Sequence, residues 1–178
     1  IIMEKISVIM GVYNCSATLP KAIESILNQT YPNIELIMCD DCSSDDTYMV
    51  AKRYQEQYPD KICLIKNEKN RSLGPTLNHC LQYATGEYIA RMDGDDYSAP
   101  NRFSKQLAFL KENPQYDLVG TNMMAFNYGG ELGLRTIKFG EATKFDTVFG
   151  VPFCHATILA MRSVIDDFQG YSCNQTTW

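Results

Sequence analysis

Three carboxylates crowd into four positions, at Asp93, Asp95 and Asp96, where an apolar stretch of the chain ends. The surrounding residues 88–100 read YIARMDGDDYSAP, so the acids follow a hydrophobic run directly. Two carboxylates about 4 Å apart repel by roughly 4 kcal/mol at an effective dielectric near 20, and the cluster therefore needs a compensating interaction. A cation, a set of backbone donors or free exposure to water supplies one. Taken alone, the pattern leaves open a metal site and a solvated turn that caps the next helix.

An Asp-x-Asp pair offers hard oxygen ligands, which suit Mg²⁺ or Mn²⁺ held against a diphosphate. An EF-hand calcium loop is excluded. With Asp93 as position 1, such a loop requires an acid or Asn at position 5, Gly at position 6 and Glu at position 12, whereas this chain has Tyr97, Ser98 and Ser104 there. A phosphotransferase of the haloacid dehalogenase type also uses Asp-x-Asp after a strand, with the first Asp as the nucleophile. This stays a minor alternative, since such enzymes usually carry the motif on their first strand and this chain carries it on the fourth.

The acids follow the last of four expected strands. These strands are apolar runs separated by stretches of helical spacing, and they lie at residues 5–10, 34–39, 61–66 and 88–92. Such alternation predicts an α/β fold, with helices on both faces of a largely parallel sheet. Ser98 and Pro100 open a further helix, and a short one begins at Ser163. Later strands are expected at residues 117–126, 132–139 and 156–161.

Polar residues occupy most of the strand ends in this predicted sheet. In an open α/β sheet, ligands bind beyond the carboxyl ends of the strands, which here are residues 11–14, 40–41, 67–71 and 93–96. A dinucleotide-binding domain would place an acid where Asp41 stands. It also needs Gly-x-Gly-x-x-Gly after the first strand, where this chain has only Gly11. The Walker A, His-Glu-x-x-His and Gly-x-Ser-x-Gly motifs are absent, which excludes P-loop, zincin and α/β-hydrolase chemistry.

Composition narrows the class of protein further. The chain has 178 residues, a net charge of -5 and no block of basic residues, which argues against nucleic-acid binding. Its 7 cysteines are an odd number, typical of a reduced cytoplasmic protein, and Cys39 and Cys42 lack the second ligand pair of a zinc site. No apolar run reaches the roughly 18 residues of a membrane span, and no signal-peptide layout is present. We expect a cytoplasmic domain, with membrane contact only through regions outside this chain.

Four segments, in this order, resemble the family 2 glycosyltransferases: SVIMGVYN, LPKAIESILNQTYPNIELIMCDDCSSDDT, GEYIARMDGDDYSAPNRFSKQ and PFCHATILAMRSV. The resemblance implies a GT-A fold, a three-layer α/β/α sandwich with a mostly parallel, mixed central sheet and a Rossmann-like nucleotide-binding half. It implies one domain over residues 1–178, with the donor-binding portion at about 1–100 and an incomplete acceptor portion at about 101–178. The implied reaction inverts the anomeric centre while a sugar moves from a nucleoside-diphosphate sugar, with a UDP-sugar expected, to a hydroxyl of a glycan or lipid-linked acceptor. Mn²⁺ or Mg²⁺ is the implied cofactor.

The resemblance also implies roles for individual residues. A nucleotide-sugar pocket is expected from Val12, Tyr13, Asn14, Asp41, Arg71, Asp93 and Gly94. Within it, Asp41 would accept a hydrogen bond from the base, expected to be uracil. Asp95 is the expected principal metal ligand, joined by Asp93 and His155 and supported by Asp96. Residue types alone also fit plainer roles: a packed ring for Tyr13, a helix N-terminal acid for Asp41, an exposed loop residue for Arg71 and a structural imidazole for His155.

The general base is where the sequence departs from the family pattern. Members usually carry a Glu-Asp or similar acidic pair shortly after a Gly-Tyr segment. Here Gly170 and Tyr171 are followed by SCNQTTW, which ends at Trp178. We therefore expect a chain truncated at its C-terminus, with its catalytic base beyond Trp178. The competing hypothesis is a nucleotide-sugar binding module without turnover.

His79 lies off the apolar stripe of its helix and is expected to be solvated.

Overall fold

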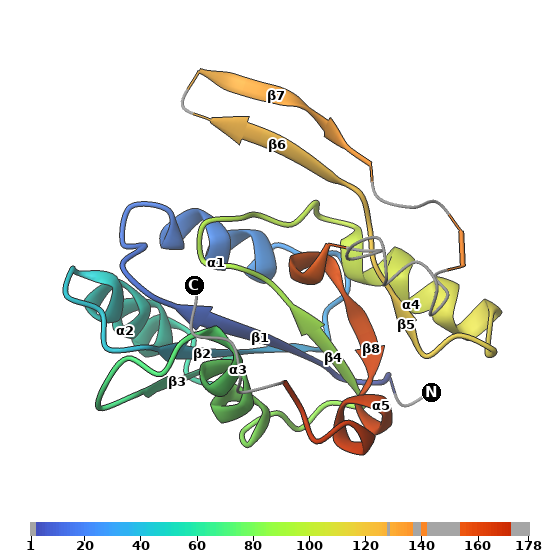
Figure 1. The fold of residues 1–178 in the computed structure, drawn as a ribbon, viewed down its shortest axis with the longest axis horizontal. Coiled ribbons are helices and arrows are strands. Elements are labelled where there is room, and N and C mark those ends of the chain that lie inside the picture. Colours follow the sequence, from blue (N-terminus) through green and yellow to red (C-terminus); the bar gives the residue numbers. More distant parts are fainter. Residues whose placement is uncertain (1–2, 128, 137–139, 142–153, 172–178) are drawn as a thin grey trace.

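The computed structural model describes residues 3–127, 129–136, 140–141 and 154–171 (Figure 1). Within these residues a six-stranded sheet has the order β3-β2-β1-β4-β8-β5. Its first four strands are parallel, whereas β8 runs antiparallel to both β4 and β5. The mixed sheet with helices on its faces confirms the predicted fold class. The strands are β1 Ile6–Val12, β2 Ile34–Asp40, β3 Ile62–Lys66, β4 Tyr88–Arg91, β5 Leu118–Val119 and β8 Leu159–Met161.

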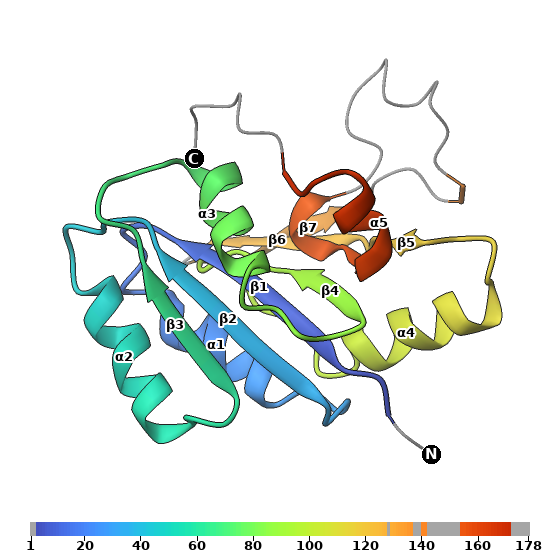
Figure 2. The same ribbon diagram turned by 90° about the horizontal axis from the view of Figure 1, so that it is seen from below.

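Helices cover the sheet on two sides, and each side has its own apolar core. Figure 1 shows α1 and α4 on one side and α3 and α5 on the other, and in Figure 2 α3 and α5 lie in front of the sheet with α1 and α4 behind it. Ile23 of α1, Val50 of α2 and Phe103 of α4 share one core cluster, while Leu77 and Cys80 of α3 belong to the second. None of the helices in the described residues is long and apolar enough to cross a membrane. The helices are α1 Leu19–Leu27, α2 Thr47–Gln57, α3 Leu73–Leu81, α4 Arg102–Glu112 and α5 Arg162–Asp167.

The strand register brings the polar strand ends together at one edge. All seven residues of β1 are buried, as expected for a central parallel strand covered on both faces. Val12 pairs with Asp40, and Asp40 pairs in turn with Lys66. On the other side of β1, Ile9 pairs with Arg91, the last residue of β4. The chain leaves β1, β2 and β4 at neighbouring points, so the residues that follow these strands meet.

The second half of the chain differs from the sequence-based expectation. The predicted strand 117–126 is two strands, β5 and β6 (Met123–Asn127), and β6 forms a separate hairpin with β7 (Gly130–Arg135) that projects from the main sheet (Figure 1). The predicted strand 156–161 is shorter in the structure, where β8 starts at Leu159. The residues before it form the 3-10 turn η2 (His155–Thr157). Thr157 Oγ1 accepts from Thr121 N at 2.9 Å, so a side chain holds this turn to the connection between β5 and β6. Residues 137–139 of the predicted strand 132–139 lie outside the described residues.

An aromatic contact links this hairpin to the loop that carries the acids. The rings of Tyr97 and Phe126 lie 4.9 Å apart, centroid to centroid. Lys21 Nζ of α1 lies 4.0 Å from the centroid of Tyr97 and 5.3 Å from that of Phe126. Cation–π attraction favours this placement of the ammonium group. The hairpin is therefore tied to the main body next to the acidic residues.

Candidate functional site

A cleft of about 510 Å³ opens where β1 and β4 end. The chain that follows β1 forms one wall, and the chain that follows β4 forms another. Five of the residues predicted to bind the nucleotide or the metal line it: Tyr13, Asn14, Asp93, Gly94 and Asp95. The remaining lining residues are Gly11, Cys15, Ser16, Ala17, Thr18, Asp45, Leu73 and Arg91.

The three predicted acids form one cluster, and two of them, Asp93 and Asp95, line this cleft. Asp93, Asp95 and Asp96 each offer a carboxylate oxygen, and these oxygens all lie within 4.8 Å of one another. Burial raises the pKa of Asp93 and of Asp96 above the ordinary value, and in each case the charge of Asp95 raises it further. Asp95 itself is exposed. Hard oxygens at this separation fit Mg²⁺ or Mn²⁺, and a cation would relieve the repulsion between them.

Arg91 is a site residue that the sequence reasoning missed. Its side chain is only 3% exposed. Nη1 donates to Asp93 Oδ2 at 3.1 Å and Nη2 donates to Asp93 Oδ1, so the guanidinium holds both oxygens of one carboxylate. The signal was present in the sequence, because Arg91 is the one charged residue in the apolar strand YIARM. A charge buried in a strand needs a partner, and Asp93 is two positions further along.

Close packing against β1 fixes the loop between Asp93 and Asp95. Thr18 Oγ1 donates to Gly94 O at 3.0 Å, which joins the start of α1 to the loop. A Cβ atom at Gly94 would lie 2.8 Å from Cys15 Sγ and 3.1 Å from Val12 Cγ1. Only glycine therefore fits there without a shift of its neighbours. Val12, predicted in the nucleotide pocket, is almost fully buried and packs behind this loop.

We expect Gly94→Ala to weaken cation binding to the acidic cluster, because the added methyl group pushes the loop away from β1. The expected cost in folding free energy is about 1–3 kcal/mol, typical of overpacking. Chemical denaturation and a Mn²⁺ titration measure the two effects. Cys15→Ala removes the nearest atom, so the Gly94→Ala/Cys15→Ala double variant should recover part of both losses. Full Mn²⁺ affinity in the single variant would contradict this account of the loop.

The loops after β1 and β2 are joined by side-chain hydrogen bonds. Asn14 has a positive φ of 48°, and its Oδ1 accepts from Ser44 N at 2.8 Å. Asn14 N donates to Ser43 Oγ at 3.0 Å, and Ser16 N donates to Asp45 Oδ2 at 3.1 Å. The amide of Asn14 thus holds the loop after β2. Tyr13, beside it, is exposed in the cleft, where a ring can contact a ligand.

Asp41 is fully buried and holds the loop before α3. Its carboxylate accepts from the backbone N–H groups of Arg71 and Ser72 at 2.9–3.0 Å and from Asn67 Nδ2 at 2.6 Å. Ser72 has a φ of 68° and immediately precedes α3, so Asp41 satisfies backbone donors at a helix N-terminus. The side chain of Arg71 is exposed and lies outside the cleft lining. Binding of the base by Asp41 stays a prediction, as does a role for Arg71.

Neither histidine belongs to the acidic cluster. The ring of His155 lies 5.1 Å from that of Tyr171, and burial, followed by the charge of Arg91, lowers the pKa of His155 to about 4. His155 is therefore neutral at pH 7, and its role as a metal ligand stays a prediction. His79 is half-buried with Nδ1 2.8 Å from Asn67 Oδ1, so the expectation that it is merely solvated is wrong. The buried Cys39 also contacts this ring, with its Sγ 3.7 Å from His79 Nδ1.

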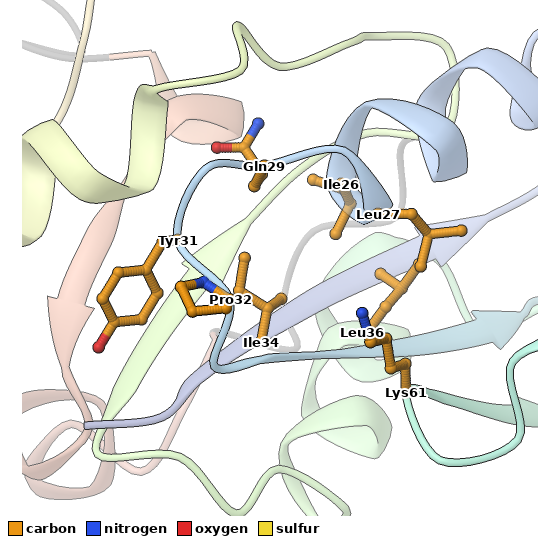
Figure 3. Close-up of a pocket in the computed structure, with 8 residues that line it drawn as sticks. All are labelled: Ile26, Leu27, Gln29, Tyr31, Pro32, Ile34, Leu36 and Lys61. Carbon is orange, nitrogen blue, oxygen red and sulfur yellow. The ribbon is translucent and has the colours of Figure 1, made fainter. Parts of the chain in front are cut away.

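A second pocket lies between the C-terminal end of α1 and the start of β2 (Figure 3). Its volume is about 140 Å³, and Lys61 is the one charged side chain among its described lining residues. It offers no carboxylate to a metal ion. The lining residues are Ile26, Leu27, Gln29, Tyr31, Pro32, Ile34, Leu36 and Lys61. The larger, acidic cleft is the better candidate for chemistry.

Comparison with known sequences points to one family. The family model described as Glycosyl transferase family 2 matches residues 7–168. The "Putative glycosyltransferase EpsE" of Bacillus subtilis (strain 168) is 49% identical over 171 residues, which cover 94% of this chain and 60% of that protein. The "UDP-Glc:alpha-D-GlcNAc-diphosphoundecaprenol beta-1,3-glucosyltransferase WfaP" of Escherichia coli is 39% identical over 109 residues, 61% of this chain and 42% of that protein. The chain thus spans 60% or less of the length of these two curated relatives.

Two solved structures share the fold. TarS 1–349 of S. aureus in complex with UDP has a TM-score of 0.76 at 24% identity, over 94% of this chain and 49% of that chain. The mannosyltransferase PcManGT of Pyrobaculum calidifontis, in complex with GDP-Man and Mn²⁺, has a TM-score of 0.74 at 21% identity, over 96% and 48% respectively. At these identities the likeness concerns the fold.

Proposed function

The chain belongs to glycosyl transferase family 2 and has a GT-A fold, and from this premise we propose that its acidic cleft binds a nucleoside-diphosphate sugar. The proposed reaction transfers the sugar to an acceptor hydroxyl with inversion at the anomeric carbon. The observation that carries the proposal is the cluster of Asp93, Asp95 and Asp96, of which Asp93 and Asp95 line the cleft at the ends of β1 and β4. The haloacid dehalogenase alternative is set aside, because the family match accounts for the Asp-x-Asp motif.

In this proposal the acidic cluster holds a divalent ion. The residues at the ends of β1 and β2 bind the nucleoside. Asp95 is the exposed acid of the cluster, lines the cleft, and is proposed as the principal ligand. A bound Mn²⁺ or Mg²⁺ supplies electrostatic stabilisation of the charge that grows on the leaving diphosphate. Tyr13 and Asn14 line the same cleft and are proposed to contact base and ribose. His155 is proposed to lie near the diphosphate as a neutral imidazole.

Donor and acceptor are proposed from the relatives. UDP is the proposed nucleotide, since TarS has been solved with UDP and WfaP is named for UDP-Glc. The proposed acceptor is a glycan or lipid-linked saccharide in polysaccharide synthesis, in line with the diphosphoundecaprenol substrate in the name of WfaP. We assign donor binding to residues 1–100 and the start of the acceptor portion to residues 101–178. The general base is proposed to belong to the part of the protein that follows Trp178.

Nucleotide binding is the direct test. We expect UDP to raise Tm by about 5–10 °C at about 100 times its Kd, since a ligand that binds only the folded state stabilises it. Thermal shift with UDP, GDP and dTDP, each with Mn²⁺ or with a chelator, measures this. UMP is the matched control, because it keeps base and ribose and lacks the diphosphate that a metal would bridge. No shift with any of the three diphosphates, either with Mn²⁺ or with a chelator, would overturn the proposal. Binding without sugar transfer in the intact protein would favour the binding-module hypothesis.

A further inference from the structure

Arg91 places a buried positive charge directly beneath the acidic cluster. Both of its terminal nitrogens contact the carboxylate of Asp93, and its side chain is only 3% exposed. The backbone of Arg91 is also fixed. Its N–H donates to Ile158 O at 3.1 Å, and its carbonyl accepts from Arg102 Nη2 at 2.9 Å. The guanidinium therefore has little freedom to follow Asp93 if that carboxylate turns towards a metal.

We propose that Arg91 is a positioning residue that holds Asp93 back from the metal, so that Asp95 and Asp96 are the ligands a divalent ion meets first. This rests on the proposed function, because it concerns the metal and the diphosphate of that same cleft. It divides the three acids into one carboxylate fixed by a cation and two that remain for coordination. The sequence-based expectation instead placed Asp93 on the metal together with Asp95.

The contacts of the acids differ in the way this proposal requires. Both oxygens of Asp93 accept from the guanidinium, a two-pronged arrangement that is among the stronger hydrogen-bonded ion pairs. Within the described residues, Arg91 has no other acid as an ion-pair partner, and its Nε is buried with no hydrogen-bond partner. Turning Asp93 away would leave a buried cation unpaired, which is strongly unfavourable. Asp95 is exposed and Asp96 half-buried, and neither forms an ion pair within the described residues.

This arrangement makes the cleft better suited to a metal together with a diphosphate than to a metal alone. Arg91 offsets one of the three negative charges and so weakens the attraction of the cluster for a free cation. Mg²⁺ and Mn²⁺ sites of this type use one or two carboxylates, with phosphate oxygens completing the coordination. The positive charge of Arg91 also favours the anionic diphosphate. We therefore expect a bound nucleotide to increase the affinity of the cleft for the metal.

The test compares the affinity for Mn²⁺ alone with the affinity for UDP at saturating Mn²⁺. Mn²⁺ alone is titrated by the electron paramagnetic resonance signal of the free ion, and UDP by calorimetry. We expect Arg91→Gln to bind Mn²⁺ alone about tenfold more tightly, because a repelling charge is lost and Asp93 is released. UDP affinity should fall at least about threefold, because a charge facing the diphosphate is lost. Opposite changes in the two affinities distinguish positioning from a general loss of structure.

Two further variants separate charge from geometry. Arg91→Lys keeps the charge without the two-pronged contact, and should gain Mn²⁺ affinity by less than Arg91→Gln. The double variant Arg91→Gln/Asp93→Asn should lose the gain, since the released carboxylate is then absent. Arg53→Gln removes the same charge from an exposed position on α2 and should match the wild type in both titrations.

The outcomes separate this inference from the proposed function. Equal or weaker Mn²⁺ binding in folded Arg91→Gln, in a protein whose wild type binds Mn²⁺ and UDP, would overturn the inference alone. A wild type that binds neither would overturn the proposed function, and the inference with it. If the Arg91 variants do not fold, Asp93→Asn and Asp95→Asn decide. The inference requires Asp95→Asn to lose much more Mn²⁺ affinity than Asp93→Asn, and equal losses would overturn it.

Discussion

Asp95→Asn is expected to abolish Mn²⁺-dependent UDP binding and to lower sugar transfer by about 10²- to 10³-fold. Asp95 is the exposed acid of the cluster and lines the cleft, so its carboxylate is the one most available to a cation. Asparagine keeps the size of the side chain and removes its charge. The fold should be unaffected, since no described ion pair depends on Asp95. Calorimetry with UDP, with and without Mn²⁺, measures the loss, and Tm without ligand checks the fold.

Asp60→Asn is the matched control for this variant. Asp60 is exposed in the turn before β3, at a position outside the cleft lining, and its loss changes net charge by the same amount. It should bind UDP as the wild type does. UDP binding that is insensitive to both Asp95→Asn and a chelator would mean that the nucleotide is held without a metal. The metal assignment would then be wrong, even if the cleft binds nucleotide.

The first four strands were predictable because burial leaves a strong local signal. In β1 every residue is buried, and the run ISVIMGV is apolar except for Ser7. The same reasoning merged β5 and β6 into one strand over residues 117–126, although Gly120, Thr121 and Asn122 interrupt the apolar run. The structure separates the two strands around Thr121, where the backbone N–H bonds to Thr157 far along the chain. Periodicity reports local burial, and it contains no information about such a distant partner.

The acidic site was predictable in composition and less so in its contacts. The Asp-x-Asp motif at a strand end located the cluster, since strands of one sheet bring their carboxyl ends together. Asp41 shows the limit of that reasoning. Its position at the end of β2 fits a ligand contact as well as a structural one, and its carboxylate accepts from Asn67, Arg71 and Ser72. Residue type and position fit both roles of Asp41 equally well. Only its hydrogen-bond partners in the structure distinguish the two roles.

Arg102→Met is expected to lower the free energy of unfolding by about 3–5 kcal/mol, the largest loss of stability expected of the variants named here. Burial lowers the pKa of Arg102 to about 10, which still leaves the guanidinium charged at neutral pH. Its nitrogens donate to Gln106 Oε1 at 3.0 Å, Ser98 Oγ at 3.0 Å and two backbone carbonyls, Arg91 O at 2.9 Å and Ile158 O at 3.2 Å. Methionine fills much of the same space and satisfies none of these acceptors.

The arginine joins three parts of the chain, so its loss should reach the site as well as the fold. Arg102 lies on α4, Arg91 O ends β4 just before the acids, and Ile158 O precedes β8. We therefore expect Arg102→Met to weaken Mn²⁺ binding along with stability, measured by urea denaturation and Mn²⁺ titration. Lys105→Met changes an exposed residue of the same helix in the same way and should alter stability by no more than about 0.5 kcal/mol. Arg102→Lys should fall between the two, because an ammonium group cannot reach all four acceptors at once. Equal stability of Arg102→Met and Lys105→Met would show that the buried hydrogen bonds of Arg102 do not hold β4, α4 and β8 together.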